Sequence, residues 1–197
     1  MGGVEFDNMF EGLFNSSFSA VVEEVIFRLF PVLLPVAVYL IMHSEGTTRI
    51  GILGLRDIML ALFKPTIFKK RLGIRWNSDL RRLEASLVFV SSIIFALAHP
   101  ASGLWGPGKF LTALIAGLVL GFSALRFGFE SSILIHWFYN AYWPSLAIAS
   151  LYSLILASFY QMVFHLTLLL GGIFLVSGIH LLLHTKKWEV FTAWFRS

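Results

Sequence analysis

The chain has 197 residues, of which 57% are hydrophobic and only 13% are charged, with a net charge of +4 and a mean hydropathy of +0.80. A soluble domain usually carries about 25% charged residues, so this composition excludes an ordinary soluble globule and predicts an integral membrane protein in contact with lipid. Cysteine is absent, which excludes disulfides, thiolate metal sites and a cysteine nucleophile. Because the positive charge is clustered, nucleic acid is not expected as a partner.

The first apolar segment covers residues 17–42 and is long enough to cross a bilayer, which takes about 20 residues. The residues before it, 1–14, are acidic and contain no basic side chain, so no signal peptide is expected. Pro31 and Pro35 are expected to kink this first helix because proline cannot donate a helical hydrogen bond.

Further segments have the same character and together predict an all-α integral membrane protein of about five transmembrane helices. These segments are 83–99, 110–127, 131–150 and 162–183, and the apolar residues 151–161 could extend the fourth helix or add a turn. Residues 50–63 are too short to span and contain Arg56 and Asp57, so they predict an interfacial or re-entrant helix. Small residues at every fourth position predict close helix packing in the third span; they are Ala113, Gly117 and Gly121.

The linker 64–82 contains seven basic residues and one acidic residue, Asp79. The positive-inside rule therefore predicts that this linker is a cytoplasmic loop of a multi-pass protein in the cell membrane. Basic residues also mark the C-terminal tail, at Lys186, Lys187 and Arg196. Four spans separate the linker from the tail, so both are expected on the same side. We interpret residues 1–197 as one membrane domain.

Three charged residues lie inside the first span, in the stretch "VVEEVIFRLF" at residues 21–30. An ionisable group at the bilayer centre costs about 2.5–3.5 kcal/mol on insertion scales, so each needs a partner or water. Glu24 and Arg28 are four residues apart and can pair on one helix face. Glu23 points about 100° away from Glu24 and needs a partner elsewhere. A charge cluster at the membrane interface, without chemistry, is the alternative interpretation.

Two histidines and an asparagine in later spans favour chemistry. His99 ends the second span, and His136 and Asn140 are four apart on one face of the fourth. With Glu23 they provide a base, hydrogen-bond donors and metal ligands. Glu23, His99 and His136 could hold Zn²⁺ with one position open for water; without metal, the glutamate could activate water beside histidine and asparagine donors. The remaining histidines are interpreted as packed, hydrogen-bonded side chains: His43, His165, His180 and His184.

Three short motifs, in the same order along the chain, resemble the motifs of a known family. "EEVIFR" at 23–28, "FALAH" at 95–99 and "HWFYN" at 136–140 resemble the E-E-x-x-x-R, F-x-x-x-H and H-x-x-x-N motifs of the CAAX prenyl protease and bacteriocin-processing family, also called CPBP or Abi intramembrane proteases. The resemblance covers residues 20–150, which we take as the motif core, and is to the type II CAAX prenyl protease-like branch.

The resemblance implies an intramembrane endopeptidase whose substrate is a peptide or a prenylated protein, cut after a lipidated cysteine. Glu23 would activate water and Glu24 would support it while pairing with Arg28. His99, His136 and Asn140 would orient the water and stabilise the oxyanion or bind metal; Phe95 and Arg28 would support the site. The family is described both as metalloproteases and as glutamate-type proteases, so both mechanisms stay open.

Two departures from the family pattern keep a non-enzymatic alternative open. Leu29 stands where the family commonly has a glycine after the motif arginine. Only 22 residues precede Glu23, whereas members of the family usually have further membrane spans before the first motif. The alternative is a membrane immunity or scaffold protein with the same helices. A proton-coupled transporter is disfavoured because inverted repeats are not visible.

One geometric problem follows from counting along straight helices. His99 would lie about 24 Å from the basic end of its helix and His136 only about 8 Å. The two can meet only if the second helix begins deep in the membrane or if residues 100–109 re-enter it, lining a water-containing cavity.

The charge pattern gives a first prediction, on topology. Single cysteines placed by Lys70→Cys and Val190→Cys should react with an impermeant thiol reagent from the same, cytoplasmic, side, since the chain has no native cysteine. Reaction from opposite sides would contradict an even number of crossings between them.

Overall fold

The computed structural model describes residues 8–44, 54–74, 77–103 and 105–184, and these ranges contain helices and no strand. The expected all-α class is confirmed. The chain divides into two compact units, Met1–Tyr142 and Trp143–Ser197, which are described separately. The acidic N-terminus (1–7) and the basic tail (185–197), on which two expectations rest, lie outside the described residues.

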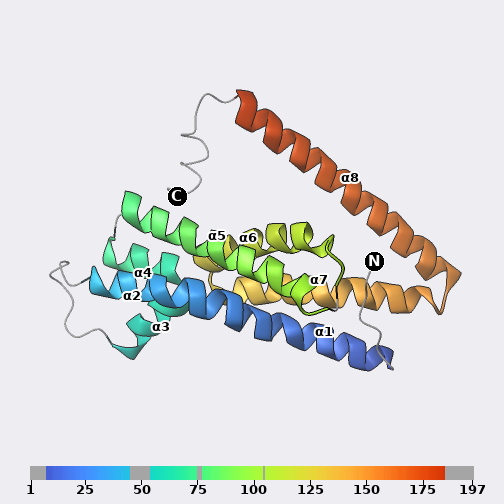
Figure 1. Ribbon diagram of the computed structural model, residues 1–197, viewed down its shortest axis with the longest axis horizontal. Helices are drawn as coiled ribbons and strands as arrows, with labels where there is room; N and C mark the ends of the chain where they lie inside the picture. The colour runs from blue at the N-terminus through green and yellow to red at the C-terminus, as the bar shows by residue number, and fades with distance from the viewer. Residues whose placement is uncertain (1–7, 45–53, 75–76, 104, 185–197) are drawn as a thin grey trace. The chain divides into compact units, whose positions relative to one another are not determined.

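The first unit opens with one long helix, made of α1 (Met9–Glu24), the π-helical segment η1 (Val25–Leu33) and α2 (Leu34–Met42) (Figure 1). Asn8 caps its start, where the side chain accepts a hydrogen bond of 2.9 Å from the Phe10 N–H. The helix therefore begins earlier than the predicted residue 17 and ends at the predicted position.

A kink was expected at Pro31, and the structure has a π-helical segment there. Proline has no N–H to donate to the carbonyl four residues before it, which belongs to Phe27. The Ser91 hydroxyl, from a later helix, donates to that Phe27 carbonyl instead. Segments of π-helix are frequent at functional sites, and this one follows directly after Glu23 and Glu24.

Two short helices follow, α3 (Leu55–Phe63) and α4 (Pro65–Leu72). α3 agrees with the short helix expected over 50–63, of which residues 50–53 lie outside the described part. α4 and the start of the next helix lie within residues 64–82, so the linker predicted to be a cytoplasmic loop contains helical segments. The side of the membrane on which it lies stays a prediction. Its Lys69 is only 1% exposed and lies 2.5 Å from Glu84. Burial lowers the pKa of Lys69 and the Glu84 carboxylate opposes that shift, so this residue serves the fold.

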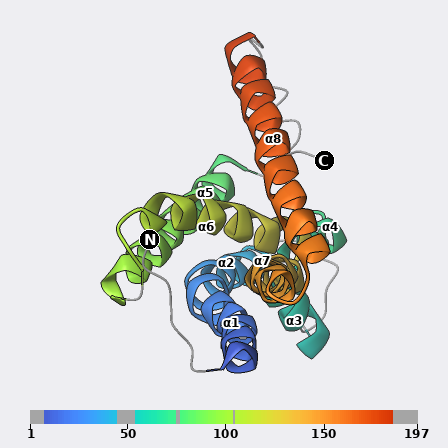
Figure 2. The same ribbon diagram turned by 90° about the vertical axis from the view of Figure 1, so that its right-hand side faces the viewer.

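The next two helices, α5 (Ser78–Ala101) and α6 (Lys109–Phe127), pack closely. A Cβ atom added to Gly117 would lie 3.0 Å from the Ser92 Cβ, and one added to Gly121 would lie 2.8 Å from Cγ1 of Val88. This confirms the small-residue packing expected for the third span. Gly128, with φ of 110°, then turns the chain into α7 (Phe129–Ser150). α7 lies against the long first helix, where His136 contacts Glu24 and Asn140 donates to the Ser16 carbonyl, and Figure 2 shows α5 and α6 side by side.

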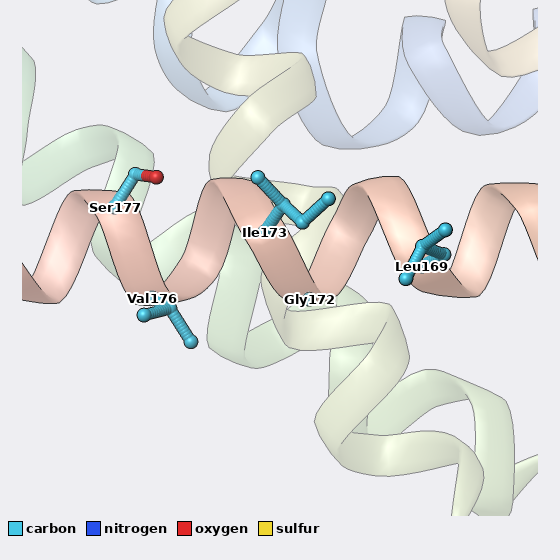
Figure 3. Close-up of a pocket in the computed structure, with 5 residues that line it drawn as sticks. All are labelled: Leu169, Gly172, Ile173, Val176 and Ser177. Carbon is cyan, nitrogen blue, oxygen red and sulfur yellow. The ribbon is translucent and has the colours of Figure 1, made fainter.

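The second unit contains α8 (Leu154–His184), which takes in much of 151–161 after a turn at residues 151–152. The surface in Figure 3 is lined by side chains from one face of α8 and has no ionisable group; it comprises Leu169, Gly172, Ile173, Val176 and Ser177. Within the described residues, four helices are long and apolar enough to cross a membrane: Met9–Met42, Ser78–Ala101, Lys109–Phe127 and Leu154–Ile173. α7, also expected to span, has the length but a more polar composition.

The α5–α6 contact gives the second prediction. Gly121→Ala should lower the melting temperature in detergent, because overpacking against the stiff Val88 side chain costs about 1–3 kcal/mol. Adding Val88→Ala should recover part of the loss, so that the double variant is more stable than the sum of the single changes implies.

Gly172→Ala is the matched control, since no atom lies within 4 Å of the position its Cβ would take. Additive effects of Gly121→Ala and Val88→Ala would contradict the packing described here.

Candidate active site

Glu24, the last residue of α1, is the centre of the charged cluster and has no exposed surface. Its Oε1 accepts a hydrogen bond of 2.8 Å from Nδ1 of His136, on α7. Its Oε2 lies 3.6 Å from Nε of Arg28, one helical turn along. The pairing with Arg28 was predicted from the i, i+4 spacing, whereas the contact with His136 was not.

Arg28 is held against an aromatic ring. The residue is 1% exposed and its guanidinium carbon lies 4.3 Å from the centroid of the Phe95 ring. A desolvated cation–π contact of this kind contributes about 2 kcal/mol. The edges of three further rings meet Phe95, with centroid distances of 5.2 Å to Phe27, 4.6 Å to His99 and 5.9 Å to His136. Phe95 therefore contacts Arg28 and both motif histidines.

Glu23 differs from its neighbour in access to solvent. Its side chain is 27% exposed, and its Oε2 lies 3.6 Å from Nε2 of His136. This distance is too long for a direct hydrogen bond, so the carboxylate is not tied to the imidazole. Glu24 is thus fully buried, hydrogen-bonded to His136 and close to the charge of Arg28. Glu23 has no direct hydrogen bond to the same histidine and is partly exposed.

His99 and Asn140 are placed less directly. Nδ1 of His99 donates to the Phe95 carbonyl at 2.8 Å, and the ring reaches the cluster through Phe95. The Asn140 amide donates to the Ser16 carbonyl at 3.1 Å and to Oγ of Ser19 at 3.4 Å, so it joins α7 to α1. The two serines, three residues apart in an apolar helix, were the sequence signal for this contact and were missed. Among the other histidines, His43 and His165 donate to backbone carbonyls, as interpreted, but both are exposed and not packed.

The expected mismatch in depth between His99 and His136 has a simple resolution. α5 is one continuous helix of 24 residues. The close approaches of Gly117 to Ser92 and of Gly121 to Val88 set α6 antiparallel to α5. The Phe95 ring contacts both histidine rings, with centroids 4.6 Å from His99 and 5.9 Å from His136. His136 therefore lies near the level of Phe95, one turn before His99.

A zinc site formed by Glu23, His99 and His136 stays a prediction. Among the described residues, no three His, Asp or Glu side chains are grouped so that they could hold a metal ion. Zinc would need ligand atoms about 2.0–2.2 Å from a common point. Both histidines use Nδ1 for a hydrogen bond, His99 to a backbone carbonyl and His136 to Glu24, and such bonds leave Nε2 as the nitrogen that faces water, substrate or metal.

Comparison with known families shows which protein family the chain belongs to. A family model described as type II CAAX prenyl endopeptidase Rce1-like matches residues 5–142. The chain belongs to this family. The matched range contains all three motifs and ends with the first compact unit, at Tyr142. No curated protein and no solved structure matches the chain. Membership in an endopeptidase family, together with the candidate spans, implies that this Rce1-like protein is an intramembrane protease.

The buried cluster gives the third prediction. Arg28→Ala should sharply lower the yield and melting temperature of folded protein, because removing one partner of a buried ion pair costs about 3–5 kcal/mol. The control is Arg82→Ala: that side chain is 82% exposed and 4.0 Å from Asp79, where ion pairs contribute little. Equal stability of the two variants would show that Glu24 does not depend on Arg28.

Proposed function

We propose that the protein hydrolyses a peptide bond within the membrane by means of a water molecule that Glu23 activates. The observation that carries this proposal is the contrast between adjacent glutamates: Glu24 has no exposed surface, while Glu23 is 27% exposed. A general base must reach both water and substrate, and only Glu23 meets that condition.

In the first chemical step water attacks the substrate, with Glu23 as the base and His136 as a hydrogen-bond donor. Glu23 removes a proton from water as the water oxygen bonds to the carbonyl carbon of the substrate, and the carbonyl electron pair moves to its oxygen. His136, whose Nδ1 donates to Glu24, is held with Nε2 toward the reacting groups. When protonated, that Nε2 donates to the developing oxyanion, and the buried Glu24 carboxylate stabilises the positive ring.

The second step releases the product. The proton on Glu23 passes to the leaving nitrogen as the carbon–nitrogen bond breaks, so the base is regenerated. His99 uses Nδ1 for the Phe95 carbonyl, which leaves Nε2 to orient water or substrate. Asn140 acts by fixing α7 to α1 through Ser16 and Ser19.

The family description supports the choice of substrate. Rce1-like CAAX endopeptidases suggest a protein with a prenylated cysteine near its C-terminus, cut on the C-terminal side of that cysteine. A substrate of this kind reaches the site from the lipid phase. Large apolar side chains along the outside of the first helix suit contact with lipid; these are Phe14, Phe18, Ile26 and Phe30.

The fourth prediction tests the base. Purified protein should cleave a prenylated CAAX-type reporter peptide, and Glu23→Gln should lower kcat at least about 100-fold, the lower range for general-base catalysis. The melting temperature should stay near that of the wild type, because Glu23 is not part of the buried pair. Glu130→Gln, at an exposed glutamate paired with Lys64, is the control and should stay active.

A strong chelator separates the two mechanisms left open by the sequence. Cleavage should continue in its presence. Loss of cleavage that added zinc restores would overturn the metal-free mechanism, and failure of the wild type to cleave any prenylated reporter would favour the scaffold alternative.

A further inference from the structure

The outer surface of α3 and α4 combines exposed apolar and basic side chains and contains no residue of the candidate active site. Both helices pack beside α2, at the α2 end of the long first helix (Figure 1). Their inner sides belong to the core cluster that also contains Val32 and Leu33 of η1; the members from α3 and α4 are Ala61, Phe68 and Leu72. The core therefore covers the inner sides of the two helices, while their outer sides are exposed.

The outer side of α3 is apolar and carries one cation. Leu55 is 76% exposed, and the exposed Ile58 and Met59 follow at the spacing of three and four residues that places side chains on one helix face. Arg56 is exposed next to them, whereas the one acidic residue of this helix, Asp57, is buried. A helix of nine residues is too short to cross a bilayer, and an arginine among apolar side chains is typical of a helix at the headgroup level.

The outer side of α4 is mainly basic. Its exposed side chains are Ile67, Lys70 and Arg71, again at the spacing of one helix face. Nη1 of Arg71 lies 3.1 Å from Oδ1 of Asp57, so this ion pair joins the exposed side of α4 to α3. The two helices therefore present their apolar and basic side chains next to each other.

The acidic side chains beside this surface already have basic partners. Asp57 pairs with an arginine of α4, and Glu130 of α7 lies 2.5 Å from Lys64, the residue between α3 and α4. Among the residues that the structure describes, Arg56 and Lys70 form no ion pair. These two exposed cations can therefore bind an anion from outside the chain.

We propose that the outer surface of α3 and α4 binds the headgroups of anionic phospholipids. The apolar side chains of α3 lie at the boundary between headgroups and acyl chains, and Arg56 and Lys70 contact the negatively charged headgroups. Apolar burial and electrostatic attraction together give basic amphipathic helices their affinity for anionic membranes. Lipid is the partner that fits both kinds of side chain, because the neighbouring helices are long and apolar enough to cross a membrane. This inference goes beyond the proposed function and does not rest on it.

The fifth prediction uses the melting temperature of the whole chain in lipid nanodiscs. Replacing half of the phosphatidylcholine with phosphatidylglycerol should raise it by about 5 °C, the order expected for two cations that each gain an anionic headgroup. The double variant Arg56→Gln/Lys70→Gln should lose most of this rise. The double variant Arg56→Lys/Lys70→Arg should keep it, because both charges are preserved.

Lys109→Gln is the matched control for the loss of a positive charge. Lys109 is the first residue of α6, whereas α4 contacts the other end of that helix, where the Thr66 hydroxyl donates to the Leu125 carbonyl at 2.8 Å. Lys109 and Leu125 are about 24 Å apart along the helix axis, so this variant should keep the rise. Each variant is compared with itself in the two lipid compositions, so a change in its basal stability does not affect the result.

Three outcomes would overturn the inference. An undiminished rise in Arg56→Gln/Lys70→Gln would mean that the anionic lipid acts elsewhere on the protein. The same rise in pure phosphatidylcholine after addition of inorganic phosphate would mean a site for a free anion. No rise in the wild type would mean that this surface does not select anionic lipid, and would favour a protein partner with acidic side chains.

A second measurement locates the apolar part of the surface. Nitroxide labels on Leu55→Cys and Met59→Cys, each the only cysteine of its variant, should be more accessible to oxygen dissolved in the bilayer than to a water-soluble nickel complex. Labels that are more accessible to the nickel complex would show that α3 lies in water, and would overturn the inference even if phosphatidylglycerol raises the melting temperature.

Discussion

The burial of the Glu24 carboxylate is the constraint on which the rest of the site depends. A charge with no exposed surface must be paired, because its desolvation costs several kcal/mol. Arg28 supplies one partner from the same helix and His136 supplies the other from α7, more than a hundred residues later. The second contact fixes the orientation of the imidazole, so that Nε2 lies toward Glu23. The need to pair the buried Glu24 carboxylate thus also orients His136, which lies between the two glutamates.

Packing between the other helices places the partners of that carboxylate. Gly117 and Gly121 let α6 approach α5 closely, and α5 presents Phe95 to Arg28 and to both histidines. The hydroxyl of Ser91, one turn before Phe95, donates to the Phe27 carbonyl, to which Pro31 cannot donate because it has no N–H. The same helix therefore supports the π-helical segment and the aromatic ring. Because Glu23 is held by none of these contacts, it is the carboxylate left accessible for chemistry.

Local patterns in the sequence predicted the local features well. Apolar length predicted the long helices, four-residue spacing predicted the Glu24–Arg28 pair, and small residues predicted the α5–α6 contact. Relations between helices could not be read in the same way. The contacts of His136 with Glu24 and with Phe95 depend on how far one helix is shifted along another, which periodicity does not encode. The burial of Lys69 against Glu84 within the basic linker was not predicted, because charge alone does not distinguish a buried lysine from an exposed one.

The state of the His136 ring tests the central claim most directly, because the account requires Nδ1 to carry the proton that it donates to Glu24. Nitrogen NMR of protein labelled with ¹⁵N-histidine distinguishes the protonated ring nitrogens, and the signal that disappears in His136→Gln gives the assignment. We expect a protonated Nδ1 in the resting protein, changed or lost in Glu24→Gln. A His136 ring protonated only at Nε2 would contradict the account, since Glu24 would then not hold the histidine that faces Glu23.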